Sequence, residues 1–169
     1  VRGRYGEIQL ERVAELAGMR SYCDFATQES SRDDEGRLKR PDMLVRLPNG
    51  RAVAVDAKTN IEAYLDAIEA TDPDEADRHL DRFARHVAEQ AQALAKKNYP
   101  GHADGAIDFV VMFIPGDQFI DAALQRRPDF LDRAAQDGVI LASPSTLVGL
   151  LRAVHVGWRE KRLSDNAEE

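Results

Sequence analysis

The sequence is poor in cysteine, in aromatic residues and in long apolar runs. Cys23 is the only cysteine among 169 residues, which excludes an internal disulfide and fits a reducing compartment. Because Cys23 lies among apolar residues of a predicted strand, we expect a buried structural thiol rather than a reactive one. No stretch approaches the roughly 18 consecutive apolar residues of a membrane span. The sequence therefore predicts a soluble cytoplasmic domain that makes no membrane contact.

The chain also lacks an excess of positive charge. Its formal net charge is −7, which argues against a protein that coats DNA through a broad cationic surface. The charge is uneven, however: residues 1–60 hold 11 Lys and Arg against 10 Asp and Glu, whereas residues 61–169 hold 12 against 20. Any surface that binds a polyanion is therefore expected in the first part.

The length and the 43% hydrophobic content fit one domain with one substantial core. We predict this domain over residues 1–163, followed by a polar tail at residues 164–169. The chain begins at Val1 within a predicted helix, with neither an initiator methionine nor a signal peptide. We therefore expect it to be a domain of a longer protein.

Apolar periodicity predicts an α/β fold. The predicted helices cover residues 4–17, 61–68, about 80–94, 118–126, 130–136 and 144–158. The predicted strands cover residues 22–28, 43–47, 51–57, 107–114 and 139–142. The helix at 61–68 is expected to bury Ile61, Leu65 and Ile68, and the polar segment 29–40 is predicted to be a mobile loop. This order of elements suits a mixed central β-sheet flanked by α-helices.

Two opposite charges stand at the end of the second strand of a predicted hairpin. Alternation along this strand sends Val53 and Val55 to one face, and Ala54, Asp56 and Lys58 to the other. An ordinary exposed strand pair would look the same and would contribute little to stability. The functional interpretation therefore depends on what lies opposite Asp56.

The hairpin loop decides whether Asp42 joins these charges, because loop length sets the register of the two strands. A two-residue turn at Asn49-Gly50 would place Asp42 on the wrong face. A three-residue loop, Pro48-Asn49-Gly50, is better supported because its residues suit a type I turn closed by a left-handed glycine. This register places Asp42 opposite Asp56. It also gathers four residues on one apolar face: Met43, Val45, Val53 and Val55.

Paired carboxylates at this position indicate a metal site. Two adjacent carboxylates repel each other unless a cation lies between them, and hard oxygen ligands suit Mg²⁺ or Mn²⁺. A metal held by Asp42 and Asp56 would polarise a phosphate and lower the pKa of a bound water, while Lys58 would orient that water or neutralise developing charge. Glu7 lies about 60° around the first helix from Leu10. It is a candidate third carboxylate, with a solvated helix glutamate as the alternative.

The pattern Pro41-Asp42 followed, after a hairpin, by Asp56-Ala57-Lys58 resembles the PD-(D/E)xK motif of the restriction-endonuclease-like superfamily. Further segments make nearly the whole chain similar to the RmuC DNA-recombination protein family: GRYGEIQLERV, RLPNGRAVAVDAK, IEAYLDAIEA, FVVMFIPGD and ILASPSTLVGLLRAV. The resemblance implies a restriction-endonuclease-like mixed sheet. It also implies metal ligation by Asp42, Asp56 and the backbone carbonyl of Ala57, with Lys58 as the catalytic lysine and Glu7 as the helix-borne acid.

The resemblance also implies features outside this chain. Members of the RmuC family are associated with limiting DNA rearrangement, and typically carry an N-terminal membrane anchor and a coiled-coil region. We therefore expect the full-length protein to be held at the inner membrane by a segment that this chain lacks. Homo-oligomers, if they form, are expected to assemble through those outside regions.

The resulting expectation is a Mg²⁺-dependent endo- or exodeoxyribonuclease with DNA as its partner. Arg37, Lys39 and Arg40 form the basic end of the polar loop directly before Pro41. They are candidates for contact with the DNA backbone, with a solvated loop as the alternative. Two other functions remain open: a DNA-binding module of the same fold that does not cleave, and a protein-interaction domain of a coiled-coil scaffold.

Overall fold

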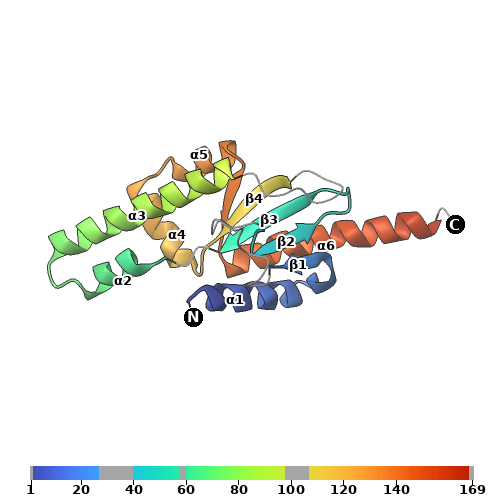
Figure 1. Cartoon of the computed structure of the whole chain (residues 1–169), viewed down its shortest axis with the longest axis horizontal. Coiled ribbons are helices and arrows are strands. Elements are labelled where there is room, and N and C mark those ends of the chain that lie inside the picture. The colour runs from blue at the N-terminus through green and yellow to red at the C-terminus, as the bar shows by residue number, and fades with distance from the viewer. Residues whose placement is uncertain (1, 27–39, 58–59, 98–106, 168–169) are drawn as a thin grey trace, which may run out of the picture.

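The computed structural model describes residues 2–26, 40–57, 60–97 and 107–167, and for residues 2–8 it describes the backbone alone (Figure 1). In chain order its elements are α1 (Arg2–Leu16), the 3₁₀ turn η1 (Arg20–Tyr22), β1 (Cys23–Phe25), β2 (Met43–Arg46), β3 (Ala52–Ala57), α2 (Glu62–Glu69), α3 (Pro73–Lys96), β4 (Ile107–Phe113), α4 (Asp117–Arg126), α5 (Phe130–Gln136), β5 (Val139–Ala142) and α6 (Pro144–Ala167). The predicted loop at 29–40 lies outside the described residues except for Arg40.

The five strands form one mixed sheet in the order β1-β2-β3-β4-β5. The first three strands are antiparallel neighbours, and β4 and β5 continue the sheet in parallel with β3. The antiparallel strands β2 and β3 need only a short turn between them, whereas the parallel pair β3 and β4 requires a crossover, which α2 and α3 supply. The predicted α/β architecture, a mixed sheet flanked by helices, is confirmed.

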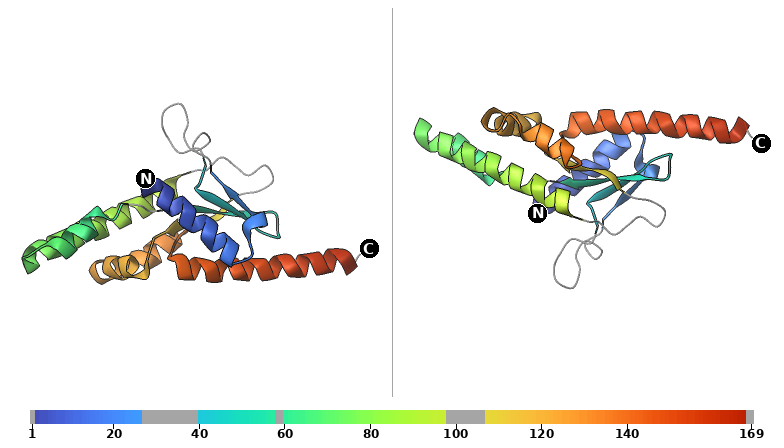
Figure 2. Two further views of the ribbon diagram at one scale, coloured as in Figure 1. Left: turned by 90° about the horizontal axis from the view of Figure 1, so that it is seen from below. Right: turned by 90° about the horizontal axis from the view of Figure 1, so that it is seen from above.

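Each face of the sheet is covered by its own apolar cluster. On one face, α1 and α6 contribute Leu10, Val13, Leu147 and Leu151, which pack with Val53 and Val55 of β3. On the other face, α3 contributes Phe83, Val87 and Leu94, which pack with Ala54, Val110 and Met112. The α2–α3 hairpin and the last part of α6 extend away from opposite ends of the sheet (Figures 1 and 2). Among the residues described, no helix is both long enough and apolar enough to cross a bilayer.

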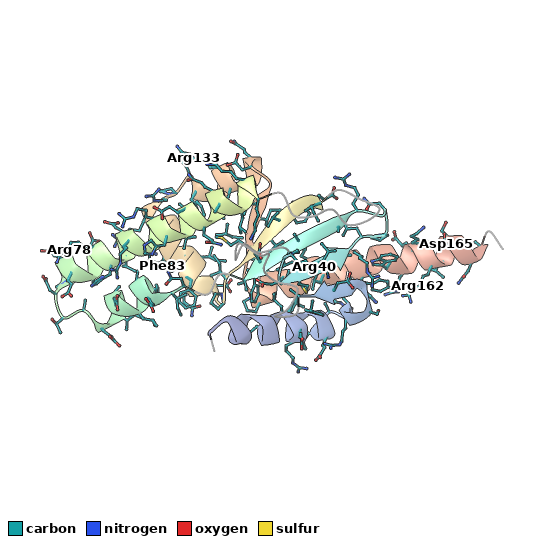
Figure 3. All side chains as sticks on the ribbon, in the orientation of Figure 1. Arg40, Arg78, Phe83, Arg133, Arg162 and Asp165 are labelled. Carbon is teal, nitrogen blue, oxygen red and sulfur yellow. The ribbon has the colours of Figure 1, made fainter. Side chains whose placement is uncertain are left out.

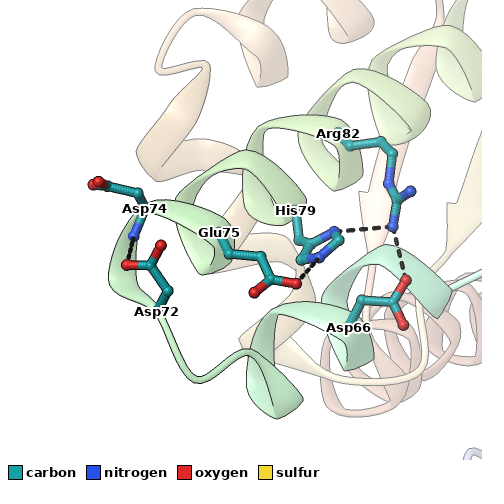
Figure 4. Close-up of polar contacts among 6 residues, drawn as sticks. All are labelled: Asp66, Asp72, Asp74, Glu75, His79 and Arg82. Carbon is teal, nitrogen blue, oxygen red and sulfur yellow. Dashed lines mark hydrogen bonds and ion pairs between the residues drawn. The ribbon is translucent and has the colours of Figure 1, made fainter.

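The α3 helix runs from Pro73 to Lys96 and so begins earlier than the start near residue 80 that its apolar pattern predicts. Asp72 caps its start by accepting a hydrogen bond from the backbone N–H of Asp74 (3.2 Å), and Pro73 occupies the first turn, where no N–H is needed (Figure 4). At the other end, the N–H of Lys97 donates to the carbonyl of Leu94 (3.1 Å) and the backbone becomes extended. The first half of α3 lies beside α2 (Figure 1). Its second half packs on the sheet through residues such as Val87 and Leu94.

Polar contacts join α2 to the first half of α3. Arg82 donates to Asp66 of α2 (2.8 Å) and contacts the Nδ1 atom of His79 (3.1 Å), whose Nε2 atom lies 3.5 Å from Glu75 (Figure 4). Because these side chains are partly exposed, each ion pair contributes little on its own. Of these contacts, the one between Arg82 and Asp66 joins the two helices, and the others lie within α3.

The predicted apolar stripe of α2 is wrong for two of its three residues, because only Ile61, partly buried, packs against the core. Leu65 and Ile68 are 40% and 66% exposed, and the helix buries Ala63 and Ala67 instead. The reason is Tyr64, whose ring meets the rings of Phe83 and Phe119 edge to face, with centroids 5.6 and 4.8 Å away. This aromatic contact, favourable in such a geometry, turns the two small alanines toward α3 and leaves the larger aliphatic residues outside.

The last helix is longer than its apolar pattern predicts. The sequence favours an end at Trp158, but α6 continues to Ala167 with exposed side chains, including Arg162 and Asp165 (Figure 3). Neither glycine nor proline follows Gly157 to end the helix, and Lys161 pairs with Asp165 one turn later (3.6 Å). Residues 164–167, part of the predicted polar tail, are therefore helical. The domain boundary at residue 163 stays a prediction.

Trp158 attaches α6 to the first strands of the sheet. Its indole ring stacks on Tyr22, with centroids 4.4 Å apart and an interplanar angle of 18°. Its Nε1–H donates to the carbonyl of Arg46 at the end of β2 (2.9 Å). A half-buried tryptophan of this kind stabilises the folded state through its buried apolar area and through its hydrogen bond.

We expect Trp158→Ala to lower the free energy of unfolding by about 2 kcal/mol, because it removes both the stacking and the hydrogen bond. Trp158→Phe keeps a ring against Tyr22 and loses only the donor, so its cost is expected to be about 1 kcal/mol. Urea denaturation followed by far-UV circular dichroism measures both variants. Equal losses for the two substitutions would contradict a contribution from the stacked ring.

Candidate functional site

The hairpin between β2 and β3 has the predicted register. Leu47 donates to the carbonyl of Arg51 (2.9 Å), Gly50 donates back to the carbonyl of Leu47 (3.2 Å), and Gly50 has a left-handed φ of 86°. The strand pairs that follow run from Arg46↔Ala52 to Met43↔Val55. One step further, Asp42 stands opposite Asp56, so the two carboxylates share a face of the sheet.

Asp42 is held from both neighbouring strands. Its Oδ2 atom accepts a hydrogen bond from the backbone N–H of Ala57 (2.7 Å), and its carbonyl accepts one from Ala26 (3.1 Å). The short distance to Ala57 is typical of a hydrogen bond to an ionised carboxylate. Asp42 thus occupies the end of the β2–β3 ladder through its side chain, and its orientation is fixed before any ligand binds.

Asp56 is the most deeply buried carboxylate among the described residues, at 4% exposure. It shares its face of β3 with Ala54, on the side that α3 covers. Its Oδ2 atom is enclosed and has no hydrogen-bond partner within the described part of the chain. Buried polar atoms are nearly always paired in proteins, so this oxygen is a candidate position for a ligand.

The electrostatics of the pair follow from this burial. Burial and then the negative charge of Asp42 raise the pKa of Asp56 to about 7. Burial also raises the pKa of Asp42, although the N–H of Ala57 and the charge of Lys97 act in the opposite direction. The surroundings therefore oppose ionisation of both carboxyl groups, and near neutral pH the second negative charge of the pair is the one they oppose most strongly.

Lys97 is a residue of this site that the sequence analysis missed. It directly follows α3, and its positive charge lowers the pKa of both Asp42 and Asp56. Its position depends on how α3 lies over the sheet, which local patterns along β3 do not reveal. The available signal was the amphipathic pattern of α3, which ends with Leu94 on its buried side.

The remaining predicted site residues are only partly described. Lys58, Arg37 and Lys39 lie outside the described residues, and Glu7 belongs to α1 but its side chain is not described. Arg40 is exposed, shortly before β2 (Figure 3). The roles of Glu7 and Lys58 stay predictions.

The described donors are of the kind that hard divalent cations prefer. Asp42 and Asp56 supply carboxylate oxygens, which Mg²⁺ and Mn²⁺ prefer, and the Oδ2 atom of Asp56 has no partner in the part of the chain that the structure describes. Two carboxylates are fewer than a full ligand set. Accordingly, within the ranges that the structure describes, no three His, Cys, Asp or Glu side chains are grouped as for a metal ion. Further oxygens would have to come from backbone carbonyls, water or a phosphate.

Fold and site together define a class: an α/β protein with two neighbouring carboxylates, one of them buried, at the ends of adjacent strands of a mixed sheet. The chain belongs to the RmuC family, whose sequence model matches residues 1–169. The DNA recombination protein RmuC homolog of Zymomonas mobilis is 38% identical over 99% of this chain and 37% of that protein. The RmuC homolog of Chlamydia muridarum is 36% identical over 99% of this chain and 37% of that protein. The DNA recombination protein RmuC of Escherichia coli K12 is 34% identical over 99% of this chain and 35% of that protein.

These comparisons cover only part of each relative. The chain spans a little over a third of the length of the curated relatives it matches. No solved structure matches the chain. The family is therefore established by sequence, and the activity of the whole protein is a separate question.

Proposed function

We propose that this domain is a Mg²⁺- or Mn²⁺-dependent deoxyribonuclease of the restriction-endonuclease-like type that acts in DNA recombination. The observation that carries the proposal is the buried Oδ2 atom of Asp56, which has no partner among the described residues and lies on the same face as Asp42. The pattern Pro41-Asp42…Asp56-Ala57-Lys58 supports a phosphodiester-cleaving centre. DNA as the substrate is supported by the relatives, which are named DNA recombination proteins.

Each residue of the proposed centre has a distinct task. Asp42 and Asp56, with the carbonyl of Ala57, would hold the cation, and the N–H of Ala57 fixes the Asp42 carboxylate in place. A divalent cation held there would supply Lewis-acid chemistry toward a phosphodiester. Lys58 would orient the attacking water or neutralise charge on the phosphate, and Glu7 would add a further carboxylate.

The substrate would reach the centre from the end of the sheet. Arg40 is exposed close to Asp42 in sequence, and we assign it, with Arg37 and Lys39, to contact with the DNA backbone, where cations replace condensed counterions. Homo-oligomers and an inner-membrane anchor would depend on regions outside this chain. Both stay predictions.

A cleavage assay tests the proposed function. Linear, single-stranded and branched DNA are incubated with the wild-type chain in Mg²⁺, in Mn²⁺ and in a chelator. We expect metal-dependent strand breaks that fall at least about 100-fold in the Asp56→Asn variant, because the substitution removes a charged oxygen from the cation site. Asp121→Asn, which changes an exposed carboxylate of α4, is the matched control and should cleave normally.

Three results would contradict or redirect the proposal. Cleavage that Asp56→Asn leaves unchanged would place the chemistry elsewhere or in a contaminant. Salt-sensitive DNA binding without cleavage in either metal would instead identify a DNA-binding module. An absence of DNA binding at low salt would favour a protein-interaction domain.

A further inference from the structure

Lys97, at the end of α3, lies outside the sequence motif but on the side of the sheet that carries Asp42 and Asp56. Leu94, in the last turn of α3, belongs to the same buried cluster as Ala54. Ala54 precedes Asp56 by two residues and shares its face of β3. The chain leaves the helix with an extended backbone at Lys97, whose N–H is tied to the carbonyl of Leu94 (3.1 Å). Lys97 therefore starts from a fixed point on the side of the sheet where Asp56 lies.

The environment of Lys97 differs from that of its neighbour. Lys97 is half-buried, whereas Lys96 is exposed. The charge of Lys97 acts on both Asp42 and Asp56, while Lys96 is not among the groups that act on either. An ammonium group on a flexible four-carbon stem can compensate a carboxylate pair and can also turn toward a phosphate.

We propose that Lys97 is a functional lysine of this centre, with two alternating contacts. Without a divalent cation its ammonium group compensates the charge of Asp42 and Asp56, and with cation and DNA bound it contacts the scissile phosphodiester. This inference rests on the proposed nuclease function and adds to it a cationic group supplied by α3 rather than by β3. It predicts that Lys97 opposes metal binding and promotes cleavage.

These opposite effects provide the test. Mn²⁺ binding to the wild-type chain, Lys97→Met, Lys97→Arg and the control Lys96→Met is measured by isothermal titration calorimetry at pH 8. Lys97→Met keeps the aliphatic stem and loses the charge, so its Kd for Mn²⁺ is expected to fall about fivefold. Lys97→Arg and Lys96→Met should bind Mn²⁺ like the wild type.

Single-turnover cleavage at saturating Mn²⁺ completes the experiment. Lys97→Met is expected to cleave at least about tenfold more slowly although it binds the metal more tightly, because the phosphate loses a cationic contact. Lys97→Arg should retain most of the rate, and Lys96→Met all of it. A purely structural role would weaken metal binding and cleavage together, so the opposite signs distinguish the two roles.

Each alternative outcome has a defined meaning. Wild-type metal affinity and cleavage in Lys97→Met would overturn the inference and leave the proposed nuclease intact. Slower cleavage with weaker or unchanged metal affinity would also overturn it. A wild-type chain that neither binds Mn²⁺ nor cuts DNA would overturn the proposed function and this inference with it. Circular dichroism establishes that each variant is folded, and Lys97→Gln replaces Lys97→Met if the latter is not.

Discussion

In the absence of metal, the Asp56→Asn variant is expected to be more stable than the wild type by about 4 kcal/mol at pH 8. Burial and the nearby charge of Asp42 raise the pKa of Asp56 from 3.8 to about 7 in the folded state. A tenfold change in a proton's dissociation constant corresponds to about 1.4 kcal/mol of free energy. Ionising Asp56 therefore opposes folding, and an uncharged asparagine of similar shape does not carry this cost.

The sign of the pH dependence follows from the direction of the shift. Since the folded state holds the Asp56 proton more tightly than the unfolded state, the wild type is favoured at low pH. Its stability should decrease as pH rises from about 4 to about 7 and then level off. The advantage of Asp56→Asn should accordingly shrink by more than half between pH 8 and pH 5.

Urea denaturation at pH 5, 6, 7 and 8 in a chelator measures this difference directly. Asp121→Asn is the control, because it removes an exposed carboxylate from α4 and should differ little from the wild type at any pH. A constant difference between Asp56→Asn and the wild type across the range would show that Asp56 ionises normally in the folded chain.

When Asp56 is ionised, its negative charge needs a positively charged partner to offset the cost of burial. The buried apolar surroundings that destabilise the ionised form of Asp56 also strengthen its attraction for a cation. Asp42, held by the N–H of Ala57, adds a second negative charge on the same face. The two carboxylates therefore attract positive charge strongly. Lys97 offsets their negative charge only in part, because the pKa of each remains raised.

The paired acids follow from local sequence, and this explains why they could be predicted. The loop Pro48-Asn49-Gly50 needs one left-handed residue, which glycine supplies. The alternation of Val53 and Val55 with Asp56 then leaves a single register that buries the apolar face. Turn chemistry and apolar alternation favour the same pairing, so the predicted juxtaposition of Asp42 and Asp56 is confirmed by the hairpin.

Contacts between distant segments could not be predicted in the same way. In α2, periodicity favoured Leu65 and Ile68 as buried residues, but the rings of Tyr64, Phe83 and Phe119 determine how the helix is rotated. The position of Lys97 depends likewise on the docking of a 24-residue helix onto the sheet. These outcomes arise from packing between elements, which the spacing of residues within one element does not specify.

Divalent cations are expected to reverse the destabilisation by Asp56. If Mg²⁺ or Mn²⁺ binds the folded chain alone, a free concentration of 100 times its Kd raises the free energy of unfolding by about 3 kcal/mol. The effect should be largest at pH 8, where Asp56 is ionised, and should be small at pH 5, because a proton then occupies the carboxylate. Asp56→Asn should show little of it at either pH.

Thermal and urea denaturation across a Mn²⁺ titration, at constant ionic strength set with NaCl, measures this stabilisation without reference to catalysis. Asp121→Asn should respond to the cation like the wild type. Equal stabilisation of all three proteins would place the cation away from Asp42 and Asp56, since general screening and surface sites do not depend on one buried group. Stabilisation that requires both alkaline pH and Asp56 would instead mean that the cation is bound by the ionised pair, the arrangement that hydrolysis of a phosphodiester at this site needs.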